Sequence, residues 1–165
     1  MSQATTTADR SGGLSAVLSW VLGRSVLDRL PDAAAWIVGI LLLAPRIYLA
    51  IPFFNAGQAR ITNWGSQSFL FQYEHPLPLL DPMQAAYLTT TFELLLPVLL
   101  VLGLFGRLAA LGLACMAATI YFVIGGAYAI PSEQVPWMAV GLLLFVTGPG
   151  RVSLDYLIRR TLLRD

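Results

Sequence analysis

Two charged residues, Arg46 and Glu93, lie inside segments that are otherwise apolar enough to cross a bilayer. A charge at mid-bilayer costs roughly 3 kcal/mol on insertion scales, so such side chains are usually paired and often mark a functional site. Counting inward from Ala34 places Arg46 about 18 Å deep, and counting inward from Met83 places Glu93 about 15 Å deep. The depths agree in a hydrocarbon core about 30 Å thick. The sequence therefore predicts an Arg46–Glu93 ion pair at mid-membrane.

Helix prolines add unpaired backbone carbonyls near this predicted pair, because each proline frees the carbonyl four residues before it. Prolines stand at positions 45, 52 and 97. The five N–H groups of a guanidinium can serve a carboxylate and a freed carbonyl together. We therefore predict an intramembrane polar site that handles a proton, a quinone-like ligand or the charge of a partner. The alternative is that the pair only fixes helix register. The predicted site comprises Arg46, Glu93, Tyr48, Thr89 and Thr90.

The composition of the chain identifies an integral membrane protein. Of its 165 residues, 57% are hydrophobic and 12% are charged, which is about half the charge of a soluble domain. The predicted fold is an all-α, four-transmembrane-helix antiparallel bundle over residues 32–150, with cytoplasmic interfacial helices at both ends. The last apolar run is short and needs polar residues upstream to complete a span. The predicted spans are about 33–56, 83–105, 108–130 and 132–147.

The basic residues, all arginine, favour four spans over three. Positively charged residues concentrate in cytoplasmic loops and flanks. With four spans both termini are cytoplasmic, and Arg60 is the one arginine left on the outer side among Glu74, Asp81 and Glu133. The other arginines outside the spans then lie inside: Arg10, Arg24, Arg29, Arg107, Arg151, Arg159, Arg160 and Arg164.

The two ends of the chain are predicted to differ in order. Residues 1–13 are polar and small, as in a disordered tail. Residues 14–31 have the spacing of an interfacial amphipathic helix, and Asp32 is a candidate N-cap for the first span. Residues 151–165 form a basic amphipathic helix that Ser153 can cap and that lies on anionic headgroups.

The outer connection from Asn63 to Pro82 is too aromatic and apolar for a loose linker. We expect Phe69, Leu70, Phe71 and Tyr73 to pack back onto the helix ends as a lid. A single histidine without cysteine nearby lacks the ligand count of a zinc or copper site, so no metal site is predicted. The residues assigned to a lid or a partner contact are Trp64, Phe69, Phe71, Tyr73, Glu74 and His75.

Three stretches of the sequence resemble the DoxX-like membrane proteins. RIYLAIPFFNAGQAR is similar to the family's first span, ELLLPVLLVLGLFGRLAAL to its second, and GPGRVSLDYLIRR to its ending. The resemblance extends from about Trp36 to Arg160, although Ala50 and Arg60 replace a more usual glycine and lysine. Its motif at the cytoplasmic ends includes Arg107, Ser153 and Asp155, and Arg151 lies beside it. The matching positions are Arg46, Phe53, Gly57, Glu93, Gly103, Arg107, Gly148, Pro149, Gly150, Ser153 and Asp155.

The resemblance implies a multi-pass protein of the bacterial inner membrane, associated in several members with redox chemistry such as thiosulfate to quinone electron transfer. The first hypothesis is a subunit or accessory protein of a redox, quinone-linked or stress-response system. The alternative is a non-catalytic anchor or scaffold that docks a partner protein through the outer loop. Enzymatic activity stays open, and we expect none of the isolated chain.

No sequence motif for binding flavin, haem, iron–sulfur or phosphate is present. The one ligand that we consider possible is a quinone. The bilayer, a protein partner in a membrane complex or a homo-oligomer are the expected associations, and the scattered basic residues form no nucleic-acid face.

Overall fold

The structure, a computed structural model, describes residues 30–74, 80–125 and 131–162. The described chain is helical and contains no strand. The disordered tail predicted for residues 1–13 lies outside the described residues. So do His75 and, except for residues 30 and 31, the interfacial helix predicted for residues 14–31.

The long helices follow the apolar runs of the sequence. Three segments are long and apolar enough to cross a membrane, Asp32–Thr62, Pro82–Leu102 and Gly106–Ile124, and Glu133–Thr147 is a shorter apolar helix. In chain order the helices are α2 (Asp32–Leu41), α3 (Leu43–Thr62), α5 (Pro82–Leu102), α6 (Gly106–Thr119) with the π-helical turn η4 (Ile120–Ile124), α7 (Pro131–Thr147) and α8 (Leu154–Leu162).

The first apolar segment is longer than predicted. We expected it to end near Ala56, but α3 continues to Thr62 and so carries Arg60 on its last turn. With α2 directly before it, the segment has 31 residues and would reach about 46 Å, well beyond a hydrocarbon core of about 30 Å. This extra length decides which arginine meets Glu93.

The connection after α3 is a compact helical cap. It consists of η2 (Trp64–Ser66), α4 (Gln67–Phe69) and the π-helical η3 (Leu70–Glu74), and it packs against α5. Asp81 then caps α5, because its carboxylate accepts a hydrogen bond from the Met83 backbone N–H at 3.2 Å.

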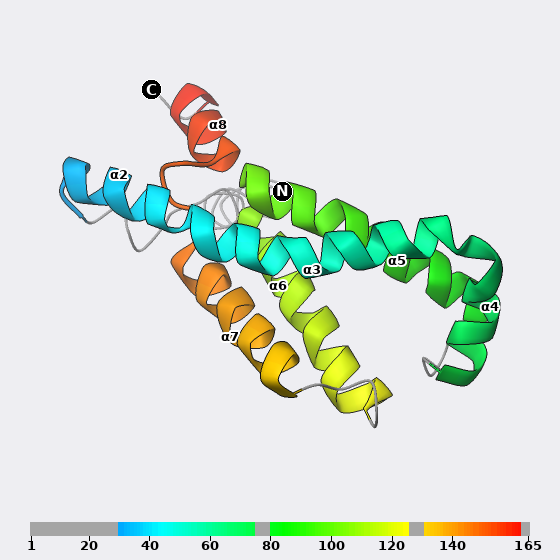
Figure 1. The fold of residues 1–165 in the computed structure, drawn as a ribbon. Helices are drawn as coiled ribbons and strands as arrows, with labels where there is room; N and C mark the ends of the chain where they lie inside the picture. The colour runs from blue at the N-terminus through cyan, green and yellow to red at the C-terminus, as the bar shows by residue number, and fades with distance from the viewer. Residues whose placement is uncertain (1–29, 75–79, 126–130, 163–165) are drawn as a thin grey trace, which may run out of the picture.

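The long helices form two antiparallel pairs, α3 with α5 and α6 with α7. Small residues allow close approach within each pair: Gly57 of α3 lies against Glu93 and Leu94, and Gly141 of α7 lies against Ala110 and Ala114. The pairs join where α5 turns into α6, and Figure 1 shows them diverging from that joint. A core between them includes Leu49, Phe53, Leu100, Leu113 and Leu144.

The close contact at Gly141 predicts a measurable stability effect. A Cβ there would lie 2.8 Å from the Ala114 Cβ and 3.0 Å from the Ala110 carbonyl oxygen. We expect Gly141→Ala to lower the thermal unfolding midpoint in detergent, because overlap costs on the order of 1–3 kcal/mol, against about 1 kcal/mol gained in helix propensity. Gly65→Ala is the matched control, since a Cβ at Gly65 meets no atom within 4 Å. Equal midpoints for both variants would contradict the packing described.

Candidate functional site

The ion-pair partner of Glu93 is Arg60. Arg60 Nε donates to Glu93 Oε2 at 2.7 Å, and Arg60 Nη1 donates to Gln67 Oε1 at 3.3 Å. The guanidinium also lies over the ring of Phe71, with its carbon 4.9 Å from the ring centroid. The predicted Arg46–Glu93 pair is therefore wrong, although an Arg–Glu pair buried between the first two long helices is present.

The register of α3 against α5 explains the correction. A Cβ on Gly57 would lie 3.1 Å from the Glu93 Cβ, so Glu93 is level with Gly57 and one turn from Arg60. A Cβ on Gly103 would lie 3.2 Å from Arg46 Nη1, so Arg46 is level with the end of α5. Depth counting failed because it placed the start of the first span at the membrane boundary and took its end to be Ala56.

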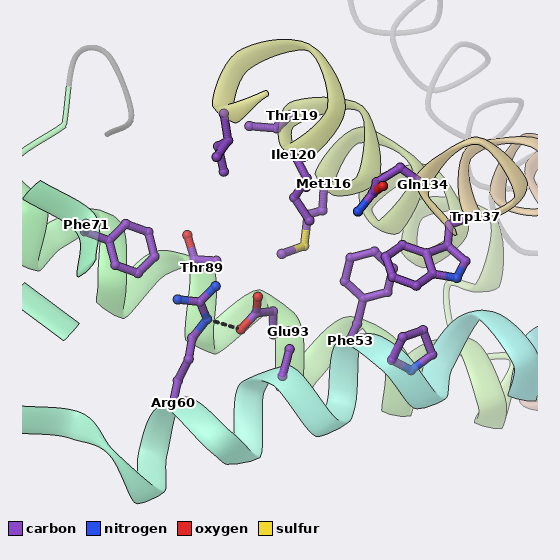
Figure 2. Close-up of a pocket in the computed structure, with 13 residues that line it drawn as sticks. Phe53, Arg60, Phe71, Thr89, Glu93, Met116, Thr119, Ile120, Gln134 and Trp137 are labelled. Carbon is purple, nitrogen blue, oxygen red and sulfur yellow. Dashed lines mark hydrogen bonds and ion pairs between the residues drawn. The ribbon is translucent and has the colours of Figure 1, made fainter. Parts of the chain in front are cut away.

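A pocket of about 380 Å³ opens beside the Arg60–Glu93 pair, between the diverging helix pairs. Figure 2 shows Arg60 and Glu93 on one side of this pocket and Gln134 and Trp137 on another. All four long helices and the cap contribute to its walls. They are lined by Pro52, Phe53, Ala56, Arg60, Phe71, Thr89, Glu93, Met116, Thr119, Ile120, Ile124, Gln134 and Trp137.

The pocket combines aromatic walls with a few polar groups. Phe53 and Trp137 pack against each other with ring centroids 5.4 Å apart. Gln134 lines the pocket with an exposed fraction of 4%, and its Oε1 has no hydrogen-bond partner among the described residues. A buried amide oxygen without a partner costs free energy unless a ligand or water satisfies it. The pocket is therefore suited to an apolar ring that carries hydrogen-bonding substituents.

The other residues predicted around this site are placed differently. Thr89 lines the pocket, whereas Thr90 is buried and is not part of the pocket wall, and its hydroxyl has no partner within the described ranges. Tyr48 is 48% exposed on the outside of α3 and does not join the polar network, contrary to the prediction. Sequence reasoning missed Gln67, Gln134 and Trp137, for which apolar patterning gave no signal.

A second polar cluster lies at the joint between the helix pairs, and Arg46 belongs to it. Arg46 is fully buried, and its Nη1 donates to the Val152 carbonyl at 2.9 Å. The carboxylate of buried Asp155 accepts from the backbone N–H groups of Phe105 at 2.9 Å and Gly106 at 3.0 Å. Asp155 thereby satisfies N–H groups at the start of α6 from a distant part of the chain.

The backbone at this joint requires tight turns. Gly103 has φ +66°, and a Cβ there would lie 2.5 Å from the Ser153 Cβ, so no other residue fits without displacement. Its carbonyl accepts the Asp155 backbone N–H at 3.0 Å. Ser153 caps α8 as predicted, because its Oγ accepts the Tyr156 N–H at 3.2 Å.

Asp32, Arg107 and Arg151 lie at the same end of the molecule as the Arg46 and Asp155 cluster. Asp32 makes no side-chain cap of its helix, contrary to prediction, and instead pairs with Arg151 at 2.7 Å. Arg107 is buried against Gly148, where a Cβ would lie 3.0 Å from its Nε. The structure thus brings the predicted residues Arg107, Arg151, Ser153 and Asp155 to one end.

The cap after α3 is only partly turned inward. Phe71 is buried with Ala85 and Ala86, and Trp64 packs against Tyr87 with ring centroids 4.8 Å apart. Phe69 and Tyr73 are 59% and 64% exposed, so the expectation that they pack onto the helix ends is wrong. Glu74 is partly buried. The cap contributes Phe71 to the pocket and presents two aromatic rings outward.

Metal-binding side chains do not gather within the described ranges, where no group of three or more His, Cys, Asp and Glu forms a site.

Burial raises the pKa of the Asp155 carboxyl above its ordinary 3.8. The N–H groups of Gly106 and Phe105 and the charge of Arg46 act in the opposite direction.

The family model that describes DoxX matches residues 40–126, more than half of the chain. The chain belongs to the DoxX family. This confirms the resemblance seen in the sequence, and the matched range contains Arg46, Arg60 and Glu93. Gln134 and Asp155 of this DoxX protein lie beyond it. Comparisons with curated proteins and with solved structures gave no match.

The Asp155 joint predicts a pH-dependent stability. A carboxyl whose pKa is raised in the folded state binds more protons than in the unfolded state between that pKa and 3.8. The free energy of unfolding contributed by this group therefore increases as the pH falls through that window. We expect the stability difference between the DoxX protein and its Asp155→Asn variant to grow toward low pH in detergent unfolding curves. A pH-independent difference would contradict it.

Proposed function

We propose that the chain is a four-span bundle in a bacterial inner membrane, with both termini in the cytoplasm. The helix α7 supports a fourth span, because its 17 residues cover about 25 Å alongside α6. The concentration of Arg107, Arg151, Arg159 and Arg160 at the joint end supports the orientation. The helix α8, whose Leu157 is half exposed, lies at the interface in this arrangement.

We infer that the pocket binds a lipid-soluble quinone-like ring and that the protein serves a redox, quinone-linked or stress-response system. The observation that carries this proposal is the pocket of about 380 Å³ with the Arg60–Glu93 pair on its wall. That volume lies in the range of small-molecule sites. A planar ring suits the walls formed by Phe53, Phe71 and Trp137.

Arg60 and Gln134, on different sides of the pocket, can form hydrogen bonds with substituents at the two ends of such a ring. The guanidinium of Arg60 donates hydrogen bonds to a carbonyl oxygen, and Glu93 holds that guanidinium in place through its 2.7 Å contact. The amide of Gln134 can donate to a carbonyl or accept from a hydroxyl. In this proposal the chain binds and orients the ring, and electrons pass to or from a partner subunit.

The first test measures bound quinone. We expect protein purified from native membranes in mild detergent to retain extractable quinone, and Glu93→Gln to lower the quinone-to-protein ratio about tenfold, because Arg60 loses its charged partner. Solvent extraction followed by chromatography gives the ratio. Glu133→Gln, which changes an exposed carboxylate outside the pocket lining, is the control and should keep the wild-type ratio.

Both variants are compared only if their thermal midpoints in detergent match that of the wild type. Equal quinone ratios for Glu93→Gln and wild type, or unchanged activity of the parent system, would defeat the proposal.

A second candidate function is a membrane scaffold that docks a partner protein through the cap. The supporting observation is the exposed pair Phe69 and Tyr73, whose ring centroids lie 4.8 Å apart. Exposed aromatic residues are enriched among those that dominate protein interfaces.

This candidate predicts a partner that leaves when the two rings are removed. We expect Phe69→Ser with Tyr73→Ser to abolish stoichiometric copurification of a membrane or periplasmic protein. Phe122→Ser, at a ring that is 73% exposed on η4, should retain it. Quantitative mass spectrometry of the purified complex measures both. Retention of the same partner by both variants would reject the docking role of the cap.

A further inference from the structure

A groove on the outer surface of the bundle is separate from the pocket. It runs between α3 and α5 and has a volume of about 370 Å³. Ala50 and Pro97 in this groove are buried, whereas Ile51 and Val98 are 53% and 43% exposed. Its lining residues are Ile47, Ala50, Ile51, Phe54, Asn55, Pro97, Val98, Val101 and Leu102.

Asn55 is the polar residue of this lining, and its side chain is exposed. It follows Ile51 by four residues, so both lie on the same face of α3. The helix ends at Thr62, seven residues or about 10 Å further on, so Asn55 lies inside the apolar segment that is long enough to cross a membrane. Its amide makes no hydrogen bond to another residue of the described ranges.

An amide on the lipid-facing side of this segment is stabilised by a protein partner. Acyl chains offer neither donors nor acceptors for its hydrogen bonds. Any partner must present a complementary group at the same depth. A second copy related by a twofold axis along the membrane normal does so automatically, because its Asn55 lies at the identical depth.

The chemistry of Asn55 also fits a twofold axis. A carboxamide carries both donors and an acceptor, so two copies can donate and accept reciprocally. Ala50 also lines the groove, and its small side chain permits the close approach that membrane helices use. Charged side chains are absent from the lining, so no repulsion opposes the contact.

We propose that the α3–α5 groove is the interface of a homodimer, in which the Asn55 amides of two copies hydrogen-bond to each other. The dimer leaves the pocket and the Asp155 joint outside the interface. The homodimer proposal can therefore be tested independently of quinone binding.

Disulfide cross-linking tests the position of the interface. The native Cys115 is exposed on α6, so it is first replaced in a Cys115→Ala background. In proteoliposomes of native lipid composition, we expect Ile51→Cys to form a disulfide-linked dimer on mild oxidation. Leu143→Cys, 52% exposed on α7, should remain monomeric.

A second measurement tests the amide itself. We expect Asn55→Leu to raise the dimer dissociation constant in bilayers roughly three- to tenfold, which is the range found for hydrogen bonds between membrane helices. Asn55→Gln should largely preserve the dimer, since it keeps the amide. Gln84→Leu removes an exposed amide from α5 outside the groove and should have no effect. Single-molecule photobleaching at several protein-to-lipid ratios gives the constants.

Three outcomes would overturn the homodimer. One is a monomer at every protein-to-lipid ratio, which leaves an acyl chain in the groove. Another is an Asn55→Leu dimer as strong as the wild type. The third is cross-linking of Ile51→Cys to a different protein in native membranes but not to a second copy. Matched thermal midpoints in detergent exclude misfolding as the cause of any loss.

Discussion

The two hydrogen bonds from the Phe105 and Gly106 backbone to the Asp155 carboxylate hold the molecule together at its joint. A helix start leaves backbone N–H groups without partners inside the helix, and in apolar surroundings these must be satisfied by the protein. Asp155 does this from α8, more than forty residues away in the chain. The same residue fixes where α5 ends and where α6 begins. The divergence of the two helix pairs, and therefore the pocket between them, starts from this point.

Arg46 and Arg60 serve different purposes at the two ends of the bundle. Arg46 is fully enclosed and bonds a backbone carbonyl, as a structural residue does. The Arg60 side chain is 20% exposed, bonds a carboxylate and an amide, and lines the pocket. A fully enclosed arginine is closed to ligands, whereas a partly open ion pair beside a cavity can contact one. Function is therefore better sought at Arg60 than at Arg46.

Much of the helical architecture was accessible from the sequence, because the apolar runs are long and the Gly-Pro-Gly stretch ends α7 clearly. The pairing of the charges was not, since it depends on register. One additional turn and a half of α3 beyond Ala56 brings Arg60 opposite Glu93, and Gly57 allows the approach that sets this register. Periodicity cannot supply such information, because both alignments bury the same apolar face. Gln134 was equally hidden, since its role depends on a cavity that forms only when the helix pairs diverge.

The contact between Arg46 and the Val152 carbonyl joins residues 106 positions apart. A ribosome delivers the chain from the N-terminus, so Arg46 enters the membrane long before its partner has been synthesised. Until Val152 is in place, the guanidinium of Arg46 must be held by lipid headgroups, water or the insertion machinery. The Arg46–Val152 contact therefore forms only after Val152 has been synthesised, and a chain truncated before Val152 would retain an unpaired charge that quality-control proteases can recognise.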